Sequence, residues 1–247
     1  MKIAIHIFRW ILSHIRLIIA VISIAIGIYL IPFFLLYSDQ LLILGYQHLR
    51  MIGLAMPPAI GIGVGLGIWI HQSHRRAWIV LGMASIIMTI PSIALFGAMI
   101  PFLAPLGGGV GTVPAVIALI LYSQLPIIRN TYQGLKNVEP GVMKAALGMG
   151  MTRREILFRI QLPLALPVIF AGIRIAVVMG VGIAAVAAYI GAGGYGRWIF
   201  GGIRRTYPQM VLAGALVISL LAIFLDTLLA RLQWWLTPAP LRNYHPY

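Results

Sequence analysis

The chain has 247 residues, of which 61% are hydrophobic and only 9% are charged, and its mean hydropathy is +1.00. Soluble domains carry about 25% charged residues, so this composition excludes an ordinary soluble globular protein. Cysteine is absent, which excludes disulfides, thiolate metal sites and cysteine nucleophiles. The net charge of +14 would suggest nucleic-acid binding in a soluble chain, but these charges lie between hydrophobic runs. They therefore favour basic cytoplasmic loops and contact with anionic membrane lipid, with no nucleic-acid partner.

Six apolar runs are long enough to cross a bilayer, which takes about 20 residues as a helix. Spans are expected at 17–37, 48–70, 77–104, 111–128, 164–190 and 209–231. The first run is too long for a signal-peptide core and lacks a small-residue cleavage site, so we interpret it as a membrane helix. The third run is long enough to be tilted, or to be broken around Pro91 and Pro101.

The basic residues predict the orientation of these spans. With the amino terminus in the cytoplasm, thirteen Lys and Arg residues fall on the cytoplasmic side. The outer side receives only Arg50, Arg197, Arg204 and Arg205. This distribution is a positive-inside bias, and it predicts that both termini are cytoplasmic.

The segment between the fourth and fifth spans, residues 129–163, is polar enough to leave the membrane. Pro140 suits the first position of a helix, because its missing N–H costs nothing there. Gly148 and Gly150 then predict an interruption of that helix.

A second short helix is expected from 153 to 162. Thr152 and Glu155 form a capping-box pattern, in which the Thr hydroxyl accepts from the Glu155 backbone and the Glu side chain reaches back. Pro163 should limit the continuation of this helix and set the bend into the fifth span. The pair of helices is either a basic surface lying on the membrane or a rigid elbow that inserts into a partner protein. The physics of the residues leaves both alternatives open.

The elbow also carries a motif. The residues KAALGMG at 144–150, followed by nine residues and then IQLP at 160–163, resemble the signature loop of bacterial ABC-importer permeases. That pattern is Glu-Ala-Ala, three residues, Gly, nine residues, Ile, any residue, Leu-Pro. The matching positions are Ala145, Ala146, Gly150, Ile160, Leu162 and Pro163. The resemblance implies that the elbow, with Lys144, Gly148 and Thr152, is the coupling helix that docks in a groove of the ATP-binding subunit.

Lys144 departs from the pattern, which has glutamate at this position. A salt bridge made by that carboxylate in relatives would be absent or reversed here. Some importers combine two different permeases, and we hypothesise that Lys144 marks one member of such an unequal pair. A purified complex with two identical copies of this chain would contradict the hypothesis.

Other segments resemble osmoprotectant permeases, including TIPSIAL at 89–95, GTVPA at 111–115, LPIIRNTY at 125–132 and IGAGGYG at 190–196. The resemblance covers roughly 48–235. It implies an all-α type I ABC importer permease of the MetI-like kind, with five core helices and one additional span. The expected organisation is a cytoplasmic N-terminus with the extra span (1–40), a permease core (41–236) and a cytoplasmic tail (237–247).

The resemblance also implies partners and a function. The substrates would be glycine betaine, choline, carnitine or a similar compatible solute, imported across a bacterial inner membrane. A solute-binding protein would act outside, an ATPase carrying ATP and Mg would act inside, and a second permease, identical or paralogous, would complete the pathway. The chain itself would bind no cofactor or metal and would catalyse no reaction.

Candidate pathway or gate residues come from the spans and from the glycine-rich loop 191–208, which is expected to form an outer gate and to receive the binding protein. They are Pro91, Ser92, Arg174, Tyr189, Gly193 and Gly194. Arg174 either lines the pathway or ties the fifth span to a neighbour, and the second role is favoured because a bare cation would repel a quaternary ammonium solute. Asp226 is expected near the cytoplasmic interface with Arg231 as its partner.

Other features keep simpler interpretations. Gly61, Gly63, Gly65 and Gly67 form two small-xxx-small pairs, which favour close helix packing over flexibility during gating. All histidines are placed at termini or span ends, which argues against an intramembrane enzyme. A stand-alone secondary transporter or channel is the main alternative, although it would have no use for the elbow motif and no inverted repeat is detectable.

Overall fold

The computed structural model describes residues 17, 21 and 24–237. All regular structure in this part of the chain is helical. An apolar helix, Ile24–Leu36, comes first. It is followed by α2 (Ser38–Ile70), α3 (His74–Thr89), α4 (Ser92–Leu103), η1 (Ala104–Leu106), α5 (Thr112–Lys136), α6 (Pro140–Gly148), α7 (Arg153–Ile156), η2 (Leu157–Gln161), α8 (Leu162–Val186), η3 (Ala187–Ile190), α9 (Gly196–Arg204) and α10 (Pro208–Leu236).

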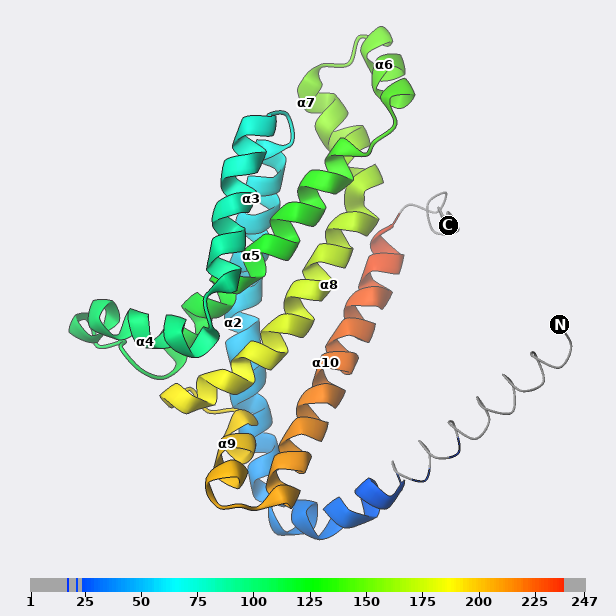
Figure 1. The fold of residues 1–247 in the computed structure, drawn as a ribbon. Helices are drawn as coiled ribbons and strands as arrows, with labels where there is room; N and C mark the ends of the chain where they lie inside the picture. Colours follow the sequence, from blue (N-terminus) through cyan, green and yellow to red (C-terminus); the bar gives the residue numbers. More distant parts are fainter. Residues whose placement is uncertain (1–16, 18–20, 22–23, 238–247) are drawn as a thin grey trace, which may run out of the picture.

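The long helices form an elongated bundle (Figure 1). Helix α5 packs between α2 and α8, and α10 packs along α8. The short helices α6 and α7 project at one end of the bundle, which we call the elbow end, and α9 lies at the opposite end, the α9 end (Figure 1). This arrangement places the two candidate functional regions at opposite ends of the same helices.

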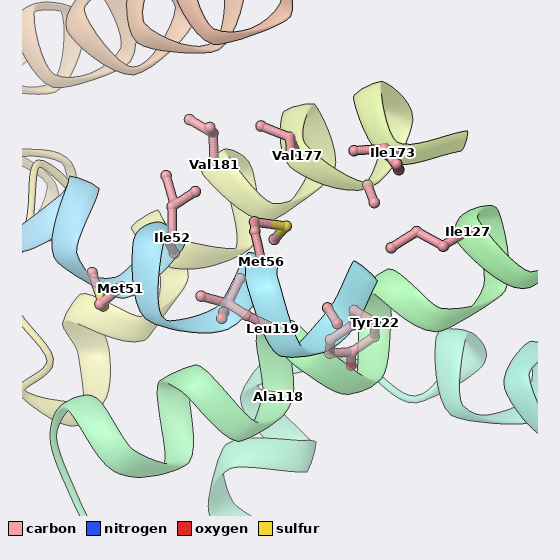
Figure 2. Packing of buried hydrophobic residues seen from close by; sticks show 14 of the residues in the cluster. Met51, Ile52, Met56, Ala118, Leu119, Tyr122, Ile127, Ile173, Val177 and Val181 are labelled. Carbon is pink, nitrogen blue, oxygen red and sulfur yellow. The ribbon is translucent and has the colours of Figure 1, made fainter. Parts of the chain in front are cut away.

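The core consists of side chains from α2, α5 and α8 that meet along the length of the bundle. Figure 2 shows Ile52 and Met56 of α2 between Leu119 of α5 and Val177 of α8. Each of these side chains is buried. Because lipid is as apolar as these residues, close packing rather than water exclusion holds such helices together.

Glycines bring α2 and α5 into close contact. A Cβ atom built on Gly63 would lie 2.6 Å from the Ile127 side chain, and one built on Gly67 would lie 2.4 Å from the Thr131 side chain. Nothing lies within 4 Å of the corresponding positions on Gly61 and Gly65. Of the two predicted small-xxx-small pairs, the 63/67 pair therefore packs within the described bundle and the 61/65 pair faces outward.

The third predicted span is broken, as its prolines suggested. Helices α3 and α4 meet at an angle of 99° around Pro91. Ile90, which precedes the proline, has extended backbone angles (φ −70°, ψ 128°), as the steric demand of the proline ring requires. The Tyr122 hydroxyl of α5 donates a hydrogen bond to the Ile90 carbonyl. The break thus has a partner on a neighbouring helix. Pro101, by contrast, lies inside α4 without ending it.

The predicted spans agree with the helices in position but not always in length. The described residues contain four helices long and apolar enough to cross a membrane, or five if the bent α3–α4 pair counts as one span. Helix α2 starts ten residues before the predicted position 48, and α5 continues eight residues beyond 128. The predicted first span, 17–37, is described only in part, as Ile24–Leu36, and the predicted tail falls outside the described residues beyond position 237.

Candidate functional site

The elbow is built from two short helices joined by a tight turn. Pro140 occupies the first turn of α6, as predicted, and Gly148 is its last residue. Gly150 adopts φ +80°, a left-handed conformation that a Cβ atom would strain. The Thr152 hydroxyl accepts a hydrogen bond from the Glu155 backbone at 3.3 Å, and the Glu155 carboxylate accepts one from the Thr152 backbone at 2.9 Å. The capping box predicted from the sequence is therefore confirmed.

Hydrogen bonds stabilise the charged form of Glu155 in the elbow more than ion pairing does. Hydrogen bonds from Thr152, and more weakly the nearby charge of Arg159, hold the pKa of the Glu155 carboxyl below its ordinary value. Arg159 Nη1 lies 4.0 Å from Glu155 Oε1, but both side chains are well exposed, so this pair adds little stability. The exposed cations around the turn are Lys144, Arg153 and Arg154.

The elbow connects directly to a membrane helix. After α7 the chain makes one π-helical segment, η2, and continues into α8. The prediction that Pro163 limits the second helix was wrong, because the candidate membrane helix runs without a break from Arg153 to Ile190. The wider π turn, closed by a bond from the Leu162 N–H to the Leu157 carbonyl, precedes the proline and accommodates it within the first turn of α8. Motion of the elbow would therefore be passed to α8 without a hinge.

The residues of the predicted coupling loop separate into an outward and an inward group. Lys144, Ala145, Gly148, Gly150 and Thr152 are exposed. Ala146 is buried, and Ile160, Leu162 and Pro163 are half-buried at the junction with α8. A small cleft of about 280 Å³ lies beneath the elbow, lined by residues of both helices and by His71 and Gln72 after α2.

At the α9 end, the gate candidates lie in a glycine-rich turn held by α2. Gly193 and Gly194 have positive φ angles of +86° and +77°. The Gln47 side chain accepts a hydrogen bond from the Gly194 N–H at 3.0 Å. A Cβ atom on Gly193 would lie 2.3 Å from the Gln47 side chain, and one on Gly194 would lie 2.9 Å from the His48 side chain. Tyr189, on η3 beside this turn, is exposed.

Helix α9 is attached to the beginning of α2 by two further hydrogen bonds. The Trp198 indole N–H donates to Gln40 at 3.1 Å, and the Tyr195 hydroxyl donates to the Leu41 carbonyl at 2.9 Å. Trp198 is fully buried and packs edge-on against Phe33 of the apolar N-terminal helix. The first turns of α2, which were expected to be a loop, are helical and hold the α9 end together.

The position of His48 differs from the one expected from the sequence. It was assigned to the end of a span, yet its side chain is fully buried and its Nε2 lies 3.1 Å from the Val181 carbonyl of α8. The reason is that α2 begins at Ser38, so His48 lies three turns inside the helix. The sequence carries a signal for this contact region, because three polar residues interrupt a mostly apolar stretch: Gln40, Gln47 and His48. No group of three or more metal-ligating side chains occurs among the described residues.

The remaining gate candidates lie elsewhere. Arg174 of α8 forms a bidentate ion pair with Asp226 of α10, with both N–O distances at 2.8 Å. The expected partner of Asp226, Arg231, is therefore not the one found. Arg231 is exposed and lies farther along the same helix, whereas Arg174 faces Asp226 from the neighbouring one. Pro91 and Ser92 lie at the α3–α4 break, so the six candidates do not form one site.

The sequence matches the model of the family "binding-protein-dependent transport system inner membrane component" over residues 59–238. The chain belongs to this family. The matched permease region contains the elbow, the α9 end and the Arg174–Asp226 pair. Its geometry is thus that of a membrane-embedded transport subunit whose elbow and α9 end lie at opposite ends of the bundle (Figure 1).

Several characterised permeases are similar along most of their length. The osmoprotectant import permease protein OsmW of Salmonella typhimurium is 52% identical over 81% of this chain and 93% of its own. The carnitine transport permease protein OpuCB of Listeria monocytogenes is 38% identical over 87% of this chain and 96% of its own. The choline transport system permease protein OpuBB of Bacillus subtilis is 37% identical over 87% and 97%.

Solved structures support the permease fold. An inward-facing MetNI methionine ABC transporter chain superposes with a TM-score of 0.70 at 23% identity, over 78% of this permease and 94% of that chain. An amino acid ABC transporter chain gives 0.59 at 18% identity, over 81% and 95%. The predicted all-α, MetI-like importer fold is therefore confirmed.

Proposed function

We propose that this permease is the translocation subunit of an ATP-driven importer of compatible solutes such as glycine betaine, carnitine or choline. The family and the similarity to osmoprotectant, carnitine and choline permeases support this function. The proposed partners are an ATP-binding subunit that carries ATP and Mg, an extracytoplasmic solute-binding protein, and a second permease, identical or paralogous. Both termini are proposed to be cytoplasmic, which puts the elbow end inside and the α9 end outside.

The observation that carries the proposal is the elbow that leads directly into the start of α8. Its turn is held by Gly150 and the Thr152–Glu155 capping box, and Ala145 lies exposed on α6. A small exposed residue lets a partner surface approach the helix backbone closely. Because α8 continues from the elbow without a break, a push on α6 by an ATPase would move a helix of the bundle core.

The experiment is to co-purify the tagged chain with its transporter subunits and to measure ATPase activity with binding protein and glycine betaine. The wild-type chain should bring down an ATPase that loaded binding protein stimulates. Ala145→Leu should abolish both co-purification and stimulation by filling the docking surface. Ala215→Leu, a matched change at an exposed position of α10, should leave both intact. Solute transport into liposomes by the chain alone, without ATP, would instead support a secondary transporter.

A further inference from the structure

His48 of α2 is a fully buried side chain that can take up a proton, and it lies toward the α9 end of the bundle. Its Nε2 atom lies 3.1 Å from the Val181 carbonyl of α8. Its Nδ1 atom packs against the glycine-rich turn at 191–195, because a Cβ atom built on Gly194 would lie 2.9 Å from Nδ1. A single imidazole therefore contacts both α8 and the turn that precedes α9.

These contacts suit only one protonation state of His48. A backbone carbonyl can only accept a hydrogen bond, so Nε2 carries the hydrogen and donates it to Val181. In the neutral ring Nδ1 is then an acceptor, and this buried atom has no hydrogen-bond partner among the described residues. A second proton would create an N–H at Nδ1 without an acceptor, together with a positive charge shielded from solvent. The packed arrangement thus accommodates the neutral imidazole and excludes the charged one.

The elements around His48 supply no counter-ion for a charged ring. The titratable group beside it is the phenol of Tyr195, whose ring centre lies 5.8 Å away and whose hydroxyl donates to the Leu41 carbonyl. Arg174, the charged residue of α8, is paired with Asp226. The charged side chains of α2 and α9 are exposed: Asp39, Arg50, Arg197 and Arg204. A proton on His48 would therefore remain uncompensated unless the ring moved.

We propose that His48 is a proton-sensitive latch on the 191–195 turn. The neutral ring holds the turn against α2 and α8, together with the adjacent Gln47, which accepts from the Gly194 N–H at 3.0 Å. Protonation displaces the ring from its buried position and so releases the turn. The latch itself is independent of the proposed function. Only the compartment that supplies the proton rests on that function, which puts the α9 end outside.

The direction of the pH effect follows from proton linkage. The released form takes up a proton that the latched form excludes, so release becomes more favourable as the pH falls. An accessible imidazole takes up its proton near about pH 6.5. One linked proton should therefore raise the equilibrium constant for release about fivefold between about pH 6.5 and 5.5.

The test is hydrogen exchange of the full-length permease in nanodiscs of neutral lipid, followed by mass spectrometry and corrected for intrinsic rates. The pH should run from about 8 to 5.5, the range in which histidine changes its charge. Protection of residues 191–198 in the wild type should fall about fivefold over the last pH unit. His48→Gln keeps an amide N–H that can donate to Val181 but takes up no proton in this range. It should be protected like the wild type at about pH 8 and should lack the acid step.

Two further variants separate the proton from the hydrogen bond. His48→Leu has no donor, so its turn should be less protected at every pH and should show no acid step. His74→Gln changes an exposed histidine at the start of α3 and should keep the wild-type step. Constant protection of the wild-type turn across this range, or an equal step in His48→Gln, would overturn the inference. Because the measurement needs neither an ATPase nor a solute, a failure of the proposed function would leave its result unchanged.

Discussion

The ion pair between Arg174 and Asp226 gives the sharpest prediction about stability. It joins α8 to α10 through two N–O contacts of 2.8 Å, and each side chain is about one-third exposed. Gln233 extends the network by accepting from Arg174 at 3.4 Å and donating to the Pro167 carbonyl at 3.4 Å. These contacts connect two mostly apolar helices through polar side chains.

Removing one member should cost more than removing both. At a charge separation of about 4 Å and an effective dielectric constant near 20, the pair attracts by roughly 4 kcal/mol. Arg174→Met leaves Asp226 charged and unpaired among apolar surfaces, and we expect it to lower the free energy of unfolding by about 3–5 kcal/mol. The double variant Arg174→Met/Asp226→Leu replaces the pair by apolar side chains, and we expect a change of no more than about 1 kcal/mol.

The assay is reversible unfolding of the purified permease by SDS in mixed micelles, followed by tryptophan fluorescence. The two single variants and the double variant form a thermodynamic cycle, from which we expect a coupling energy of several kcal/mol. Gln233→Ala, which removes only the two long hydrogen bonds, should cost about 1 kcal/mol and serves as the control. Single variants as stable as wild type, or a double variant that loses the sum of the single losses, would refute this reasoning.

Two further predictions concern packing and the elbow. Gly67→Ala should destabilise the permease by about 1–3 kcal/mol, because its new methyl would lie 2.4 Å from the Thr131 side chain, whereas Gly65→Ala meets nothing within 4 Å and should be neutral or slightly stabilising in the same unfolding assay. The hydrogen bonds from Thr152 lower the pKa of the Glu155 carboxyl below its ordinary value of 4.5. The capping box should therefore stabilise the elbow fully at pH values above 4.5. This contribution should be lost as the pH falls through the lower pKa of the folded state. Hydrogen exchange of α7, corrected for intrinsic rates, should show this acid-dependent loss of protection in the wild type, and Thr152→Ala should be less protected at neutral pH and lack the acid step. Equal protection in the two proteins across this pH range would show that the box does not hold the elbow.

Local patterns located most of the long helices and the two short helices of the elbow. The apolar runs located the long helices, Pro140 and the capping box located α6 and α7, and Gly150 marked the left-handed turn. Each of these signals acts within a few residues of the chain. A cap, a proline ring or a glycine conformation depends on its immediate neighbours, so it can be recognised before the helices are assembled.

The partners of the polar side chains and the faces on which the helices meet depend on how the helices pack together. The local expectation paired Asp226 with Arg231, five residues away, but the carboxylate meets Arg174, 52 residues away on α8. The polar residues at the start of α2 extend that helix because Gln40 and Gln47 find partners in the α9 region, and no local pattern names those partners. Of the four glycines in the predicted small-xxx-small pairs, only Gly63 and Gly67 face α5. These outcomes depend on which faces of distant helices meet, and that choice is made by the packing of the whole bundle.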